Sequence, residues 1–133
     1  MRKVEAELAE LGFPVIAVAA DRPEKLALSL ESKGLGYALY SDSSLLAARK
    51  FGIVFQLDDE TLARYLSFGF DLEDASGYDH HQLPVPSVFL VGAGGTIHWV
   101  YSNADYKVRP ENEKLMRAAR ALAAREATLR QAD

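Results

Sequence analysis

The stretch that decides the fold is LPVPSVFLV at residues 83–91, followed by GAGG at 92–95 and TIHWVY at 96–101. Two prolines lead into an apolar run that is too short for a helix and rich in β-branched and aromatic residues, which is typical of a buried strand. Pro86 stands where the strand begins, a position at which a missing backbone N–H is tolerated. The glycines then turn the chain into a second strand, so the sequence predicts a β-hairpin.

Helices and strands alternate on either side of this hairpin. VIAVAA at 15–20 is an uninterrupted apolar run, of the kind that is buried on both faces in a parallel sheet. A first helix is expected over residues 2–11, ended by Gly12, and a second from Asp21 to Lys33. A third is expected from the cap Ser43 to about Phe51, and a fourth from a cap at Asp58 or Asp59. The last should begin at Pro110 and fray after Arg125. Short strands are expected at 37–40 and near 51–55, and a polar loop at 71–82. The alternation predicts one α/β domain over residues 1–133, with a largely parallel sheet and a terminal antiparallel hairpin.

Composition excludes several classes of function. The 133 residues carry a net charge of −4, which argues against nucleic acid or a membrane surface as a partner. No apolar run approaches the length of a membrane span, and the start MRKVE lacks the apolar core of a signal peptide, so the cytoplasm is the expected compartment. The chain has no cysteine, which excludes a disulfide framework, a thiolate metal site and every thiol mechanism within this polypeptide.

Several motifs together resemble the peroxiredoxin-like AhpC/TSA family, from Glu5 to about Ala123. The motifs are YALYSD at 37–42 running into AARKFGI at 47–53, LPVPSVFLV at 83–91 with GTI at 95–97, and NADY at 103–106. The resemblance implies a thioredoxin-like fold and a family chemistry of peroxide reduction or thiol–disulfide exchange. It marks Val85, Pro86 and Ser87 as the surface equivalent to the family's active site, with a cis bond before Pro86, and it singles out Asp105 and Tyr106.

One departure from the family bears directly on mechanism. Family members begin with a strand and a redox-cysteine loop ahead of the helix that here starts at Met1, so the expected fold is N-terminally truncated. Two hypotheses follow. Either the chain is a fragment of a redox enzyme, or it is a cysteine-free binding or regulatory domain that acts through the surface around Pro86, His80 and His81. In both, this polypeptide is expected to be inactive in thiol redox chemistry and to need no cofactor.

Candidate site residues each have a simpler interpretation. His80 and His81, beside Asp79, could bind a metal ion, but solvated loop histidines are favoured and no metal site is expected. Asp42 and Asp105 could form an acid–base pair, although Asp42 is more simply a helix-cap acceptor. The glycines at 92–95 run into a strand rather than a helix, which favours a hairpin turn over a phosphate loop. A hydrolase triad of Ser87, His98 and Asp105 has no nucleophile-elbow pattern.

The missing strand predicts a partner. In the thioredoxin fold it lies between the strands that match residues 15–20 and 88–91, and a buried backbone group without a partner costs about 1–3 kcal/mol. Either those two strands pair directly or another chain supplies an edge. The sequence therefore favours a homodimer, with an exchanged strand as one form of it.

Overall fold

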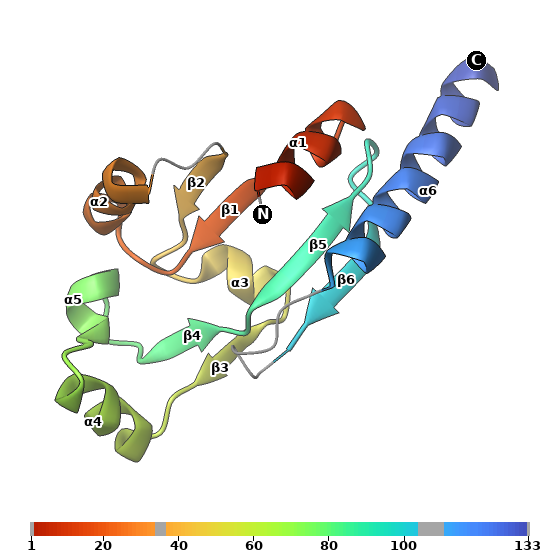
Figure 1. The fold of residues 1–133 in the computed structure, drawn as a ribbon. Helices are drawn as coiled ribbons and strands as arrows, with labels where there is room; N and C mark the ends of the chain where they lie inside the picture. The colour runs from red at the N-terminus through yellow and green to blue at the C-terminus, as the bar shows by residue number, and fades with distance from the viewer. Residues whose placement is uncertain (1, 34–36, 104–110, 133) are drawn as a thin grey trace. The chain divides into compact units, whose positions relative to one another are not determined.

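The computed structural model describes residues 2–33, 37–103 and 111–132, which contain six helices and six strands (Figure 1). These residues form two compact units. Met1–Val15 and Pro86–Asp133 make up the first unit, and Ile16–Val85 make up the second. The mixture of helices and strands agrees with an α/β fold. In the described part of the chain no helix is long and apolar enough to cross a membrane.

The first unit contains the predicted hairpin. Strand β5 (Ser87–Val91) pairs antiparallel with β6 (Ile97–Ser102), with Leu90 opposite Trp99. Gly95 has a φ of 83°, a conformation that residues with a Cβ seldom adopt, so a glycine is required at this point of the turn. The prediction of a β-hairpin is confirmed.

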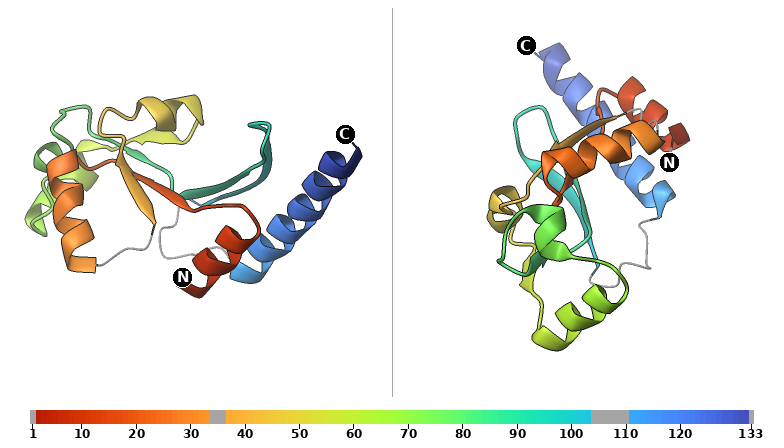
Figure 2. Two further views of the ribbon diagram at one scale, coloured as in Figure 1. Left: turned by 90° about the horizontal axis from the view of Figure 1, so that it is seen from above. Right: turned by 90° about the vertical axis from the view of Figure 1, so that its left-hand side faces the viewer.

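Two helices pack against the hairpin. Helix α1 (Arg2–Glu10) ends where Gly12 turns left-handed with a φ of 92°, as the sequence indicates, and it lies beside α6 (Asn112–Ala132) in both views of Figure 2. The buried core of the unit consists of Leu8, Leu90, Leu115, Met116, Ala119 and Leu122. In α6 the adjacent Leu115 and Met116 are followed by Ala119 and Leu122 at intervals of three or four residues, the spacing of one helix face. Pro110, the expected helix start, lies outside the described residues, and the expected fraying after Arg125 stays a prediction because α6 continues to Ala132.

The second unit opens with a parallel pair, β1 (Ile16–Ala19) with β2 (Ala38–Ser41), and α2 (Pro23–Lys33) packs against β2. The expectation that β1 is buried on both faces is wrong, because Ile16 is 60% and Val18 55% exposed. The physical reason is that a face is buried only when another layer packs on it. Helix α2 packs against this pair, but among the described residues the face that carries Ile16 and Val18 is left uncovered.

The other strands of this unit are antiparallel, which corrects the expectation of a largely parallel sheet. Strand β3 (Val54–Gln56) pairs with β4 (Gln82–Pro84), and each sheet in the described residues has two strands. Between them lie α4 (Asp59–Ser67) and α5 (Leu72–Ser76). The sequence left Asp58 and Asp59 as alternative caps of α4, and the structure selects Asp58, whose carboxylate accepts a hydrogen bond from the Thr61 N–H at 2.7 Å. The expected loop at 71–82 is wrong in part, since it contains α5 and the start of β4.

The bond between Val85 and Pro86 is trans, so the expectation of a cis bond is wrong. The trans form is the default for X–Pro bonds by about 0.5–1 kcal/mol. The Val85 N–H donates to the Ile53 carbonyl at 2.7 Å, and the Pro86 carbonyl accepts from the Asn103 N–H at 3.2 Å. Both main-chain hydrogen bonds are therefore made while the Val85–Pro86 peptide bond is in its default trans form.

Candidate functional site

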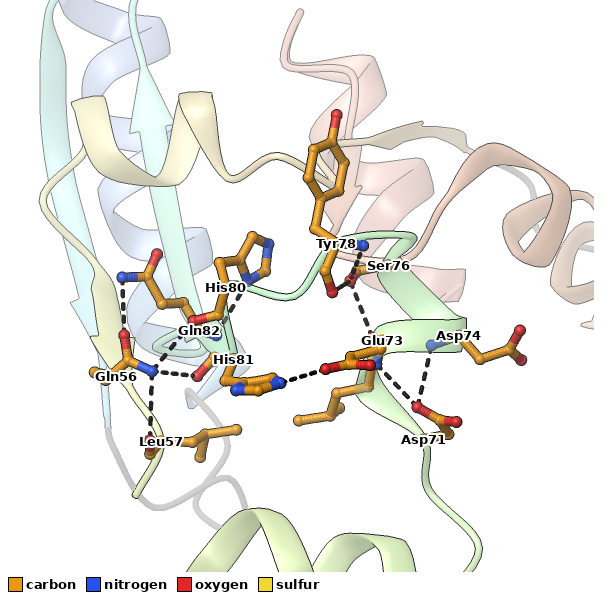
Figure 3. Close-up of polar contacts among 11 residues, drawn as sticks. Gln56, Leu57, Asp71, Glu73, Asp74, Ser76, Tyr78, His80, His81 and Gln82 are labelled. Carbon is orange, nitrogen blue, oxygen red and sulfur yellow. Dashed lines mark hydrogen bonds and ion pairs between the residues drawn. The ribbon is translucent and has the colours of Figure 1, made fainter. Parts of the chain in front are cut away.

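The histidines that the sequence singles out follow α5, and three polar contacts shape that helix. The Asp71 carboxylate accepts hydrogen bonds from the N–H groups of Glu73 and Asp74 at 3.1 and 3.2 Å. Gly77 ends the helix in the left-handed region, and the buried Ser76 hydroxyl donates to the Leu72 carbonyl at 2.9 Å. Figure 3 shows these hydrogen bonds together with the two histidines that follow α5 along the chain.

His80 is held by main-chain groups. Its Nδ1 accepts a hydrogen bond from the Gln82 N–H at 3.1 Å, so its Nε2, 3.0 Å from the Ser43 carbonyl, carries the proton and donates to that oxygen. The ring also stacks on Tyr78, with centroids 5.7 Å apart. The expectation of solvated loop histidines is therefore wrong for His80, whose ring bonds to the Ser43 carbonyl 37 residues away along the chain.

The His81 side chain contacts a carboxylate instead. Its Nε2 lies 2.7 Å from Glu73 Oε1 (Figure 3). Its backbone has a φ of 53°, a left-handed conformation that is uncommon for a residue other than glycine. The His81 carbonyl accepts from the Leu57 N–H and from Gln56 Nε2, both at 3.0 Å, and these bonds hold the chain in that conformation.

His81 and Glu73 form one wall of a hollow of about 220 Å³. We refer to it as the α4–α5 hollow, and it is lined by Leu62, Leu66, Asp71, Leu72, Glu73 and His81. Leucines from two helices supply the apolar part of the lining, and carboxylates with an imidazole supply the polar part. Such a site can hold an apolar group beside a positive charge, whereas nothing in it provides a nucleophile held against a base.

Salt bridges hold α5 to the start of α2. Asp74 lies 2.9 Å from Lys25 Nζ and 3.1 Å from Arg22 Nη2, and the Arg22 N–H donates to the Ala75 carbonyl at 2.8 Å. The hydrogen bond from Lys25, followed by its positive charge, lowers the pKa of Asp74 below the ordinary value of 3.8. The pKa of Asp58 is lowered as well, chiefly by its hydrogen bonds from Thr61. The described residues contain no group of three His, Cys, Asp or Glu side chains that could hold a metal ion.

Asp42 is a helix cap, as the sequence favours. Its carboxylate accepts from the Ala47 N–H at 3.0 Å and from the Ala48 N–H at 2.9 Å, at the start of α3 (Leu46–Lys50). The expectation that Ser43 caps this helix is wrong. Leu45 precedes α3 in a left-handed conformation, with a φ of 63°, and the turn brings Asp42 rather than Ser43 to the open N–H groups.

The residues that the family resemblance marks lie at the boundary between the two units. Val85 is the last residue of the unit Ile16–Val85, and Pro86 begins the second segment of the other unit, Pro86–Asp133. Pro86 is exposed, and the Ser87 hydroxyl donates to the Ser102 hydroxyl at 3.0 Å. Asp105 and Tyr106 lie outside the described residues.

Sequence reasoning missed the α4–α5 hollow. A signal for part of it was present, because Asp71 followed by an apolar residue and two acidic residues is a helix-start pattern. No pattern could pair Glu73 with His81, since that contact depends on the left-handed turn at His81.

The comparisons with known proteins point to one family. The profile of the AhpC/TSA family matches residues 1–100. A Haemophilus influenzae protein described as a candidate peroxiredoxin, bcp, is 38% identical over 53 residues, which are 40% of this chain and 34% of that protein. The chain thus spans about a third of the length of the curated relative it matches.

Proposed function

The chain belongs to the AhpC/TSA family, and from that membership we propose that it is a peroxiredoxin-like domain which reduces no peroxide by itself and works by binding. The proposal that the chain reduces no peroxide rests on the absence of cysteine from all 133 residues. Thiol peroxidases attack peroxide with a thiolate, and no other side chain supplies that nucleophile. Met1 and Met116 are oxidised by peroxide only once each, without turnover.

A peroxidase assay tests the proposal that the chain reduces no peroxide. Purified chain is given hydrogen peroxide or an organic hydroperoxide together with thioredoxin, glutathione or dithiothreitol as the reductant. Peroxide loss should equal that of the reductant alone, while a cysteine-containing peroxiredoxin assayed in parallel turns over. Sustained consumption that survives treatment with a chelator contradicts the proposal, because trace metal is then not the catalyst.

The binding that we propose first is self-association through the β1–β2 sheet. Ile16, Val18 and Tyr40 lie on one face of that sheet and are 60%, 55% and 57% exposed, and in register Val18 lies opposite Tyr40. Contiguous exposed apolar side chains mark interaction surfaces. The outer edge of β1, which has no strand partner in the described part of the chain, adds backbone groups that a strand of a second copy can pair.

Light scattering after gel filtration tests the homodimer. The expected mass at micromolar concentration is twice the 14.6 kDa of one chain. Val18→Lys places a like charge on both copies of the face and should shift the profile to monomer. Val100→Lys is the matched control, because Val100 is 51% exposed on β6 and stands outside the proposed interface. A monomeric wild-type chain contradicts the homodimer, and equal behaviour of the two variants contradicts the β1–β2 face as its interface.

The exposed Pro86 supports a second candidate surface, which the family resemblance marks together with the neighbouring Ser87. Binding there predicts that Pro86→Ala disrupts the dimer while Val18→Lys leaves it intact. The same light-scattering experiment therefore separates the two surfaces.

A further inference from the structure

We propose that the α4–α5 hollow receives a large apolar side chain of a positively charged peptide segment. This inference names a partner class for the binding function proposed above, and it uses a surface different from the β1–β2 face. If the homodimer or the lack of peroxidase activity is disproved, the peptide-binding proposal is not affected. If peptide binding is disproved, the other two proposals are not affected.

Helix α4 presents an apolar stripe that the rest of the unit does not bury. Leu62 and Leu66 are one helical turn apart and both line the hollow, yet none of the nine residues of α4, all of them described, is buried. Leu66 is 53% exposed, and the chain that continues from it exposes Phe68 and Phe70 by 69% and 63%. The leucine stripe, half-buried at Leu62 and exposed at Leu66, is available for contact with a partner.

The size of the hollow fits a side chain. Its volume of about 220 Å³ exceeds the roughly 150 Å³ of a cavity that holds benzene. It lies below the roughly 300–1,000 Å³ typical of pockets for whole small-molecule ligands and cofactors. One phenylalanine or leucine side chain from a partner fills such a space, with the peptide backbone remaining at the open rim.

The charge around the hollow selects a basic partner. Residues 58–79 carry Asp58, Asp59, Glu60, Asp71, Glu73, Asp74 and Asp79, and Arg64 is their only lysine or arginine. Lys25 and Arg22 compensate Asp74, and Arg64 lies 3.7 Å from Glu60. No ion pair compensates Asp59, Asp71 or Asp79 among the described residues, and the Glu73 carboxylate contacts the His81 imidazole (Figure 3). The field therefore attracts lysine and arginine and repels acidic segments.

Fluorescence anisotropy with a labelled synthetic peptide tests the proposal. The peptide consists of lysines around one central phenylalanine, and two reference peptides replace either the lysines by glutamates or the phenylalanine by serine. We expect binding of the first peptide alone, weakening as salt is raised. Leu66→Ser should weaken binding about tenfold, the effect of losing one buried anchor. Glu73→Gln should weaken it about threefold, the size expected for one partly exposed charge.

Matched controls separate the hollow from general surface effects. Leu129 is 68% exposed and the Glu113 side chain 85% exposed, both on α6, so Leu129→Ser and Glu113→Gln should leave binding unchanged. Amide hydrogen exchange of the wild-type chain gives a readout that needs no variant, and the peptide should slow exchange in residues 59–67 and 72–76. Equal binding of the glutamate peptide, equal loss in a control variant, or slowed exchange confined to other segments overturns the proposal.

Discussion

Removing most of the Leu90 side chain should destabilise the first unit strongly. Leu90, the fourth of the five residues of β5, is 5% exposed, pairs with Trp99 in register and packs in the cluster that α1 and α6 cover. Leu90→Ala removes buried methyl groups and leaves a cavity, because the two helices and the hairpin can close around it only in part. Substitutions of this kind cost about 2–5 kcal/mol, and the near-complete burial of Leu90 predicts about 3 kcal/mol.

Urea unfolding followed by tryptophan fluorescence measures this loss. Trp99 is the only tryptophan and packs against the same cluster, so its emission reports on the unit that is changed. With a denaturant slope of about 2 kcal/mol per molar urea, a loss of 3 kcal/mol lowers the midpoint by roughly 1.5 M. Since small domains have roughly 5–15 kcal/mol of stability in total, the variant is expected to remain folded without denaturant.

Leu129→Ala is the control for Leu90→Ala, because Leu129 is 68% exposed. Surface substitutions stay within about 0.5 kcal/mol. A midpoint shift for Leu90→Ala no larger than that of Leu129→Ala would refute the assignment of the core. A change in slope without a change in midpoint would instead mean that the compactness of the unfolded chain had changed.

Three further outcomes are expected. Asp42→Ala should cost about 1 kcal/mol in thermal unfolding followed by circular dichroism, because two N–H groups of α3 lose their acceptor, whereas Asp79→Ala should cost nothing measurable; equal costs would contradict the cap. Gly95→Ala should cost about 1–2 kcal/mol because its φ is 83°, and Gly94→Ala, whose added Cβ meets nothing within 4 Å, should be nearly neutral; the reverse order would contradict the turn geometry. Because the folded-state pKa of Asp74 lies below 3.8, its contribution is present above that pH and is lost as the pH falls further, so urea midpoints should drop below about pH 3.8 and Asp74→Asn should reduce the drop.

The sequence predicts those parts of the fold that local patterns determine. The hairpin, the left-handed glycine after α1 and the aspartate cap of α4, expected at Asp58 or Asp59, each depend on residues within a few positions of one another. The apolar run at 15–20 misled because its pattern indicates a strand without showing what covers each of its faces. Burial on both faces needs a packed layer on each, and the face with Ile16 and Val18 is exposed.

Local sequence patterns could not predict the candidate site, because its contacts depend on distant residues and on an unusual backbone turn. His80 bonds to the Ser43 carbonyl, 37 residues away, and His81 reaches Glu73 through a left-handed turn that the sequence does not mark with glycine. Helix α5 has five residues, too few for an apolar period to emerge, so only the cap at Asp71 could have revealed it. The two adjacent histidines could be identified as unusual, while their opposite roles could not.

Helix α6 extends past its last core residue, and its amide protons should exchange with solvent in a graded order. Leu122 is 3% exposed and ends the buried stripe, but one turn later Glu126 Oε1 accepts the Ala93 N–H at 2.7 Å from the hairpin turn. Amides up to Glu126 are then released only when the helix detaches from the hairpin. Those beyond it, around the exposed Leu129, open by fraying alone and exchange orders of magnitude faster. We therefore expect the Glu126 carboxylate to mark the point along α6 beyond which the amide protons exchange fast.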